Sequence, residues 1–160
     1  MFGDKLKFVP IAKSSVSFPG KALLKHKGYI TLKLEKIYKQ EMRIKIIRSD
    51  FSQGFYQREI VMSGAKDAIP RELAHIKVLM ENLNAKIRKE VLEGKKPFGK
   101  ILSENKVLSK KEIKCFFKVY KNDYILKYAR NKRSVFYGRS SFIFLANSKK
   151  ILAQVTEIFL

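Results

Sequence analysis

Apolar and polar residues alternate along several segments of the chain, which is typical of β-strands that bury one face. The alternation predicts five strands, over Met42–Ile47, Phe55–Ser63, Ile113–Tyr120, Val135–Leu145 and Lys150–Leu160. A sixth segment, Ile69–Met80, fits the spacing of either a strand or a helix. Short turns at 52–54 and 146–148 join neighbouring strands, so we expect antiparallel hairpins there.

Segments with helical spacing of apolar residues lie between these strands. The spacing predicts helices over 17–25, Tyr29–Lys39 and Glu81–Leu92, and a short helix over Lys100–Leu102. Gly28 and Gly94 stand where helices are expected to end. The charged segment 122–132 is expected to be a loop or a partly ordered insertion. Together these elements predict one α+β domain over residues 1–160, with a single antiparallel sheet of about six strands and flanking helices.

Two of the predicted strands carry a charge on an otherwise apolar face. Glu157 shares its face of the last strand with Ile151, Ala153, Val155 and Phe159. Arg58 shares its face of the second strand with Tyr56, Ile60 and Met62. The opposite face of the second strand carries Gln57 and Glu59, which we expect to face water.

A lone charge on a core face costs several kcal/mol, roughly, unless it is paired or used. Three interpretations therefore stand side by side. Arg58 and Glu157 form a buried ion pair without a ligand, or the register is shifted by one residue, which reverses every side chain. In the third, the two charges line a closed site for a small anionic ligand.

Length and composition favour a globular protein with a proper core. The chain has 160 residues, of which 46% are hydrophobic. It contains no apolar run near the roughly 20 residues of a membrane helix, and its first residues lack a signal-peptide core. We therefore expect a cytoplasmic protein that does not enter a membrane. The single cysteine, Cys115, is expected to be a small packed residue in a strand.

The formal net charge of +21 raises the question of a nucleic-acid partner. Lysines are spread along almost every segment, however, and the densest local group is Arg130, Lys132 and Arg133. A solvated basic surface that helps to collect small anions explains this distribution better. The sequence leaves open whether the protein is a monomer or a dimer.

The sequence contains no recognisable catalytic triad, metal-binding motif or phosphate-binding loop. The sequence gives neither histidine, His26 or His75, a recognisable catalytic role. Two glycine-containing turns, 28–31 and 97–99, bring backbone N–H groups to the start of a predicted element. Such N–H groups can hold a carboxylate. Simple helix initiation is the better explanation of each turn taken alone, but together with an inward Arg58 and Glu157 the two turns would complete an anion pocket.

An ordered set of short motifs resembles the chorismate pyruvate-lyase (4-hydroxybenzoate synthase) family, and the resemblance is strongest over residues 28–160. The motifs are Arg58-Glu59-Ile60, Leu73-Ala74, Gly94-Lys95-Lys96-Pro97-Phe98-Gly99, Leu108-Ser109-Lys110, Tyr137-Gly138-Arg139-Ser140-Ser141 and Thr156-Glu157-Ile158-Phe159-Leu160. The resemblance implies a lyase that converts chorismate to 4-hydroxybenzoate and pyruvate without a metal or cofactor. It also implies an antiparallel sheet that encloses the ligand beneath helical flaps.

By this resemblance, Arg58 and Glu157 would be the catalytic and ligand-binding charges. Ile30, Thr31, Phe98 and Gly99 would complete the substrate site, with backbone N–H groups of Ile30 and Phe98 on the ring carboxylate. The chain departs from the family pattern at Phe98, which replaces a usual leucine, and at Tyr137, which replaces a tryptophan. A site for a different aromatic acid is therefore an alternative.

Two further classes of function stay open. Effector domains of bacterial regulators resemble this lyase fold, which makes a non-catalytic module that senses small aromatic acids an alternative. Such domains normally follow a DNA-binding helix-turn-helix, and the first 27 residues are expected to be too short for one. A basic nucleic-acid-binding protein is the third class, and it does not explain why Arg58 and Glu157 face inward.

Overall fold

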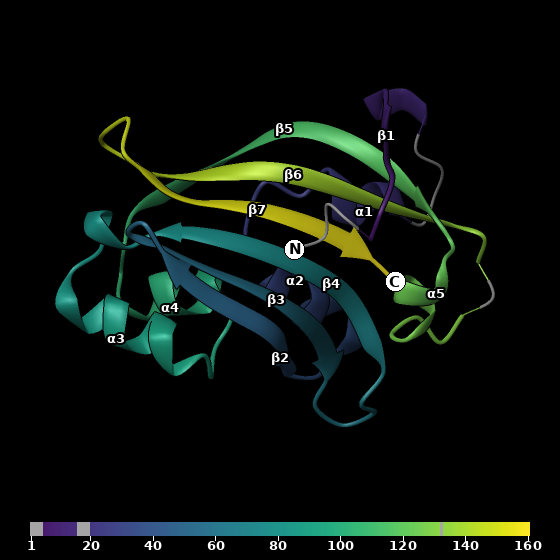
Figure 1. The fold of residues 1–160 in the computed structure, drawn as a ribbon, viewed down its shortest axis with the longest axis horizontal. Coiled ribbons are helices and arrows are strands. Elements are labelled where there is room, and N and C mark those ends of the chain that lie inside the picture. Colours follow the sequence, from purple (N-terminus) through teal and green to yellow (C-terminus); the bar gives the residue numbers. More distant parts are fainter. Residues whose placement is uncertain (1–4, 16–19, 132) are drawn as a thin grey trace.

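The computed structural model describes residues 5–15, 20–131 and 133–160, which fold around one antiparallel sheet (Figure 1). Its seven strands lie in the order β1-β5-β6-β7-β4-β3-β2. The strands are β1 (Phe8–Ile11), β2 (Met42–Ser52), β3 (Phe55–Gly64), β4 (Pro70–Leu79), β5 (Ser109–Tyr120), β6 (Val135–Leu145) and β7 (Ile151–Phe159). The α-helices are α1 (Gly20–Leu24), α2 (Ile30–Tyr38), α3 (Ala85–Glu93), α4 (Phe98–Glu104) and α5 (Asp123–Leu126).

This architecture confirms the predicted α+β class and its single antiparallel sheet. The ambiguous segment is a strand, β4, which lies between β3 and β7. The predicted hairpins β2–β3 and β6–β7 are both present. The sheet has one strand more than expected because the short β1 pairs with the edge of β5, where Phe8 lies opposite Val119.

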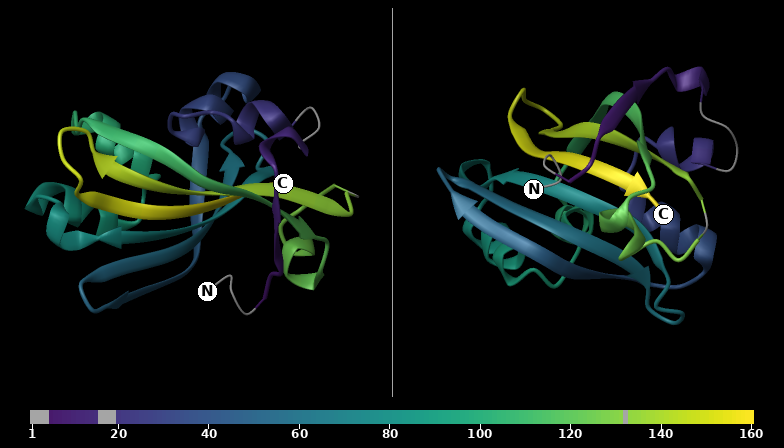
Figure 2. Two further views of the ribbon diagram at one scale, coloured as in Figure 1. Left: turned by 90° about the horizontal axis from the view of Figure 1, so that it is seen from above. Right: turned by 45° about the vertical axis from the view of Figure 1, so that its right-hand side comes forward.

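One face of the sheet carries the helices α1 to α4, and two apolar clusters fill the space between them. Side chains of α3 and α4, among them Val91 and Ile101, pack on Val78 and Ala153 of the sheet. In the second cluster, side chains of α1 and α2, among them Leu24 and Leu34, pack on β2, β3 and β4. The two helical groups lie over different parts of the same face, as the turned views show (Figure 2).

The other face of the sheet is covered by α5 and by the N-terminal segment. Leu6 and Ile125 pack there against Leu73 and Ile158. The amide of Asn122 donates to the Lys5 carbonyl at 2.7 Å and so joins the two covering segments. The segment 122–132 was expected to be a loop or a partly ordered insertion. It contains the short helix α5, which packs in the apolar cluster on this face of the sheet.

The helix ends follow local sequence. Asn84 caps α3 by accepting a hydrogen bond from the Ile87 N–H at 2.9 Å, so this helix begins later than predicted. Gly94 ends α3 with φ of 67°, as its glycine predicts. The helix α4 is longer than the predicted Lys100–Leu102. The first residues of the predicted helix 17–25 lie outside the described residues, and α1 covers 20–24. No helix in the described part of the chain is long and apolar enough to span a membrane.

Two predictions about burial are wrong. Glu59 does not face water: it is fully buried, and it accepts hydrogen bonds from Arg48 and from the Tyr124 hydroxyl at 3.0 Å. The cause is α5, which covers a face that the alternation alone left open. Cys115 is exposed rather than packed. It directly follows a β-bulge in β5, between Ile113 and Cys115, which shifts the alternation of the strand.

Candidate functional site

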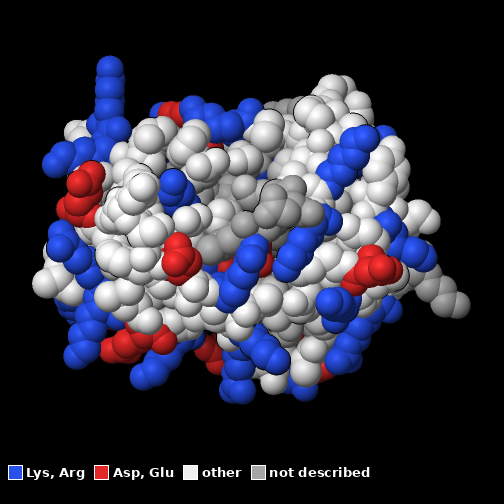
Figure 3. Space-filling model, viewed as in Figure 1, with Lys and Arg blue, Asp and Glu red and all other residues white. Residues whose placement is uncertain are grey.

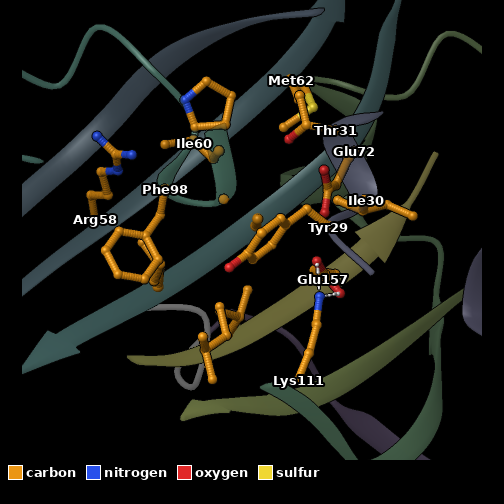
Figure 4. Close-up of a pocket in the computed structure, with 16 residues that line it drawn as sticks. Tyr29, Ile30, Thr31, Arg58, Ile60, Met62, Glu72, Phe98, Lys111 and Glu157 are labelled. Atoms are coloured by element: carbon orange, nitrogen blue, oxygen red, sulfur yellow. Dashed lines mark hydrogen bonds and ion pairs between the residues drawn. The ribbon is translucent and has the colours of Figure 1, made fainter. Parts of the chain in front are cut away.

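A small pocket lies between the helix-covered face of the sheet and the first turns of α2 and α4 (Figure 4). Its volume is about 50 Å³. By this measure it holds only about four water molecules, at roughly 10–15 Å³ each. The lining residues are Tyr29, Ile30, Thr31, Arg58, Ile60, Met62, Glu72, Ala74, Ile76, Pro97, Phe98, Gly99, Lys111, Ile143, Val155 and Glu157. A ring-sized ligand would require α2 or α4 to move outward.

Two helix starts close the pocket. Ile30 is the first residue of α2 and Phe98 is the first residue of α4. The first N–H groups of a helix have no acceptor within the helix, so both starts offer donors to a ligand. Gly99 allows the two starts to meet, because a Cβ atom at this position would collide with the Tyr29 ring. The Tyr29 hydroxyl is hydrogen-bonded to Ser109.

Arg58 lies at one end of the pocket and is only 1% exposed. Its Nη2 donates to the Lys96 carbonyl at 2.8 Å, which anchors the guanidinium beside the loop between α3 and α4. Its Nε and Nη1 are buried and make no hydrogen bond to any described residue. Burial lowers the pKa of Arg58, partly offset by Tyr56. A guanidinium with unused donors is suited to two oxygens of a carboxylate.

Glu157 lies away from Arg58 and has cationic partners of its own. Lys111 donates to its two oxygens at 2.8 and 3.0 Å, and the Nε of Arg139, its register partner on β6, donates at 2.5 Å. Burial favours a raised pKa for Glu157, but Lys111 and Arg139 outweigh burial and hold its pKa below the usual value. Burial lowers the pKa of Lys111, and Glu157 opposes that change. This cluster is therefore a carboxylate held between two cations.

Arg139 also ties the site to α1. Its Nη1 donates to the carbonyls of Leu23, Leu24 and His26, with 3.1 Å to Leu24. These carbonyls belong to the C-terminal end of α1 and the residues that follow, where a cation is favourable. One guanidinium thus joins the helix above the sheet to Glu157 in the pocket wall.

Glu72 is the fifth charged residue of this region and the one with the fewest partners. It is 1% exposed, and neither carboxyl oxygen makes a hydrogen bond to a described residue. Burial raises its pKa well above 4.5, and the negative charge of Glu157 raises it further. Lys111 and Arg139 oppose this change without cancelling it. Burial therefore favours the protonated form of the Glu72 carboxyl, which can donate a hydrogen bond.

The structure brings all six predicted site residues together. Arg58, Glu157, Ile30, Thr31, Phe98 and Gly99 line the same pocket. Arg58 and Glu157 face the covered side of the sheet, as the alternation predicts, but no ion pair joins them among the described residues. Their roles toward a ligand stay predictions.

Sequence reasoning missed Glu72 and Lys111 and gave Arg139 no role. Glu72 continues the alternation of Ala74, Ile76 and Val78 on β4 and was detectable by extending that pattern. Lys111 was not, because the bulge in β5 changes the face of every residue before it relative to those after it. Within the described residues, no group of three or more His, Cys, Asp or Glu side chains is placed to hold a metal ion.

In sequence, the chain is similar to an archaeal protein along most of its length. The chain is 28% identical over 158 residues to a Methanocaldococcus jannaschii protein named "Putative lyase MJ0807". The match covers 93% of this chain and 84% of that protein. The chain matches no family model. The sequence is thus similar to a lyase-like protein along almost its whole length.

Solved structures show where else the fold occurs. The effector domain of PhnF from Mycobacterium smegmatis matches with a TM-score of 0.59 at 8% identity, over 94% of this chain and 91% of that domain. A longer PhnF structure from the same organism matches with a TM-score of 0.59 at 8% identity. The match covers 84% of this chain and only 64% of the PhnF chain. At these identities the likeness shows the fold alone. The chain has the α+β fold of the PhnF effector domain, with the pocket on its helix-covered face.

Proposed function

We propose that this protein binds a small cyclic carboxylic acid, of the size and polarity of 4-hydroxybenzoate, in the pocket beneath α2 and α4. The observation that carries the proposal is Arg58, a buried guanidinium whose Nε and Nη1 have no hydrogen-bond partner among the described residues, at the end of the pocket. A buried donor without a partner is costly, so a ligand carboxylate that pairs with it would gain affinity.

The rest of the pocket fits a ring with polar groups at its two ends. Its walls between Arg58 and the Glu72–Glu157 region are apolar, formed by Ile76, Ile143, Val155 and other aliphatic side chains. A mostly apolar cavity with a few well-placed polar groups is the usual form of a small-molecule site. The fold supports the same proposal, because it is similar to that of the PhnF effector domain.

A second candidate function is chorismate pyruvate-lyase activity, favoured by the similarity to a protein named as a lyase and by the Arg58–Glu157 pair in one pocket. In this reaction the bond between ring C3 and the enolpyruvyl oxygen breaks, C4 loses its hydrogen as a proton, and the ring becomes aromatic. The departing enolpyruvate takes up a proton at its methylene carbon and becomes pyruvate, so the reaction releases no net proton. Arg58 would stabilise the departing enolpyruvate, and Glu157 would lie near the C4 hydroxyl. The closed pocket would orient the substrate and exclude water.

Incubation of the purified protein with chorismate, followed by chromatography, separates the two candidates. A protein that only binds leaves chorismate intact and is stabilised by 4-hydroxybenzoate in a thermal unfolding experiment. A lyase releases 4-hydroxybenzoate and pyruvate in equal amounts, faster than a parallel Arg58→Gln sample. If chorismate is unchanged and neither compound shifts the unfolding temperature, both candidates are wrong.

A further inference from the structure

Glu72 is a polar group for which the pocket supplies no partner. Its carboxyl lines the pocket, is almost fully buried, and makes no hydrogen bond to a described residue. Glu157 differs, because Lys111 and Arg139 already engage its oxygens. Buried polar groups are nearly always hydrogen-bonded, so a buried carboxyl without a protein partner in a pocket wall is suited to bind a polar group of a ligand.

The position of Glu72 along the sheet places it far from Arg58. Arg58 lies opposite Ile76 on β4, and Glu72 lies four residues further along that strand. At about 3.3 Å per residue, this separates the two backbone positions by roughly 13 Å. Figure 4 shows the same order, with Arg58 at one end of the pocket and Glu72 at the other, near Glu157.

The charges around Glu72 indicate which form of the carboxyl a ligand meets. Glu157 on β7, Lys111 on β5 and Arg139 on β6 surround it, and the nearby pocket residues of β3 and α2 are Met62 and Thr31. Lys111 and Arg139 are already shared with Glu157. A neutral Glu72 leaves a surplus of positive charge in the pocket once Arg58 is included, which favours an anionic ligand. It also makes the Glu72 hydroxyl a hydrogen-bond donor.

We propose that Glu72 is a specificity-determining residue that donates a hydrogen bond from its carboxyl group to an oxygen of the ligand, at the end of the ligand remote from its Arg58-bound carboxylate. This inference rests on the proposed function and deepens it. The ligand class is an acid whose ring carries an oxygen substituent opposite or nearly opposite the carboxylate. A ring acid without that oxygen would leave Glu72 without a partner.

The test compares the binding of 4-hydroxybenzoate and benzoate by calorimetric titration. Wild-type protein is expected to bind 4-hydroxybenzoate about tenfold more tightly than benzoate, the size of effect that one buried hydrogen bond produces. Glu72→Gln keeps a donor at the same place and should retain most of this preference. Glu72→Met fills similar space without a polar group and should lose it, with little change in the affinity for benzoate.

Glu59→Gln is the matched control, because Glu59 is equally buried but lies on the opposite face of the sheet. It should keep the wild-type preference. A Glu72→Met protein that retains the full preference overturns the role of Glu72 while leaving the proposed function intact. A wild-type protein that binds neither acid overturns the proposed function, and this inference with it. Circular dichroism of each variant establishes that it is folded before titration.

Discussion

Five ionisable side chains on one face of the sheet differ in whether they have an ion-pair partner. Lys111 and Arg139 both form ion pairs with Glu157, whereas Arg58 and Glu72 have no ion-pair partner among the described residues. Partners for a buried charge offset much of its desolvation, and unpaired groups do not receive this gain. The unpaired residues are therefore the ones that a ligand would stabilise most.

The contribution of the buried Glu72 to the free energy of unfolding should fall as the pH rises. The unfolded chain loses the Glu72 proton near pH 4.5, while the folded chain holds it to a higher pH because its pKa is raised. Between these two values the folded state binds more protons, so the free energy of unfolding falls with rising pH. Glu72→Gln removes this contribution. Denaturant unfolding at several pH values should show the variant gaining stability over wild type as the pH increases from about 4.5.

A difference between Glu72→Gln and wild type that is constant across this range would show that Glu72 titrates normally. Glu59→Gln is again informative, because it replaces a buried glutamate that Arg48 and Tyr124 already satisfy. It should destabilise the protein instead, since a charged pair loses one member.

The sequence was sufficient for some residues of the site and not for others. Arg58 and Glu157 lie in regular stretches, where alternation alone assigns their face. Lys111 lies before a bulge, and Glu59 lies beneath a helix from a distant part of the chain. Alternation within one strand contains no information about either feature. The contacts of Arg139 with α1 depend on tertiary packing for the same reason.

At the element scale, the pocket exists because two helix starts meet above the sheet. Gly99 in the first turn of α4 lies against the Tyr29 ring beside the start of α2. Arg139 holds the C-terminal end of α1 over the same region. The positions of α1, α2 and α4 over the pocket therefore depend on the small residue Gly99 and on the hydrogen bonds of Arg139.

Gly99→Ala should push α4 away from Tyr29. Overpacking of this kind costs about 1–3 kcal/mol, which denaturant unfolding can measure. The affinity for 4-hydroxybenzoate should fall as well, because the Phe98 N–H moves with the helix. Ser103→Ala changes an exposed position of the same helix and should affect neither quantity. If Gly99→Ala matches Ser103→Ala in both measurements, the close approach of the two helices has no importance for the site.

For the molecule as a whole, the sequence pattern predicts most of the sheet but not its edge strand. Strand alternation and short turns sufficed to predict one antiparallel sheet with helices. They could not supply β1, a four-residue strand whose pairing with β5 spans most of the chain. On the face shown in Figure 3, lysines and arginines are scattered rather than gathered in one patch. The net charge of +21 therefore acts as a general repulsion.

Salt should stabilise this protein. With 35 Lys and Arg residues against 14 Asp and Glu, charge repulsion in the folded state is weakened when ions screen it. The unfolding temperature should rise as sodium chloride increases from about 0.01 to 0.15 M, where the screening length shortens from roughly 30 to 8 Å. A temperature that falls over this range would show that the ion pairs outweigh the repulsion.

A calorimetric titration of 4-hydroxybenzoate into wild-type, Arg58→Gln and Arg43→Gln proteins tests directly whether Arg58 binds the carboxylate of the ligand. Arg43 is an exposed arginine of β2, so its replacement removes the same charge without touching the pocket. We predict binding to wild type and to Arg43→Gln with similar affinity, and a loss of at least about tenfold in Arg58→Gln, since a hydrogen-bonded charge is lost. Equal binding to all three proteins would contradict the assignment of Arg58 as the carboxylate-binding residue.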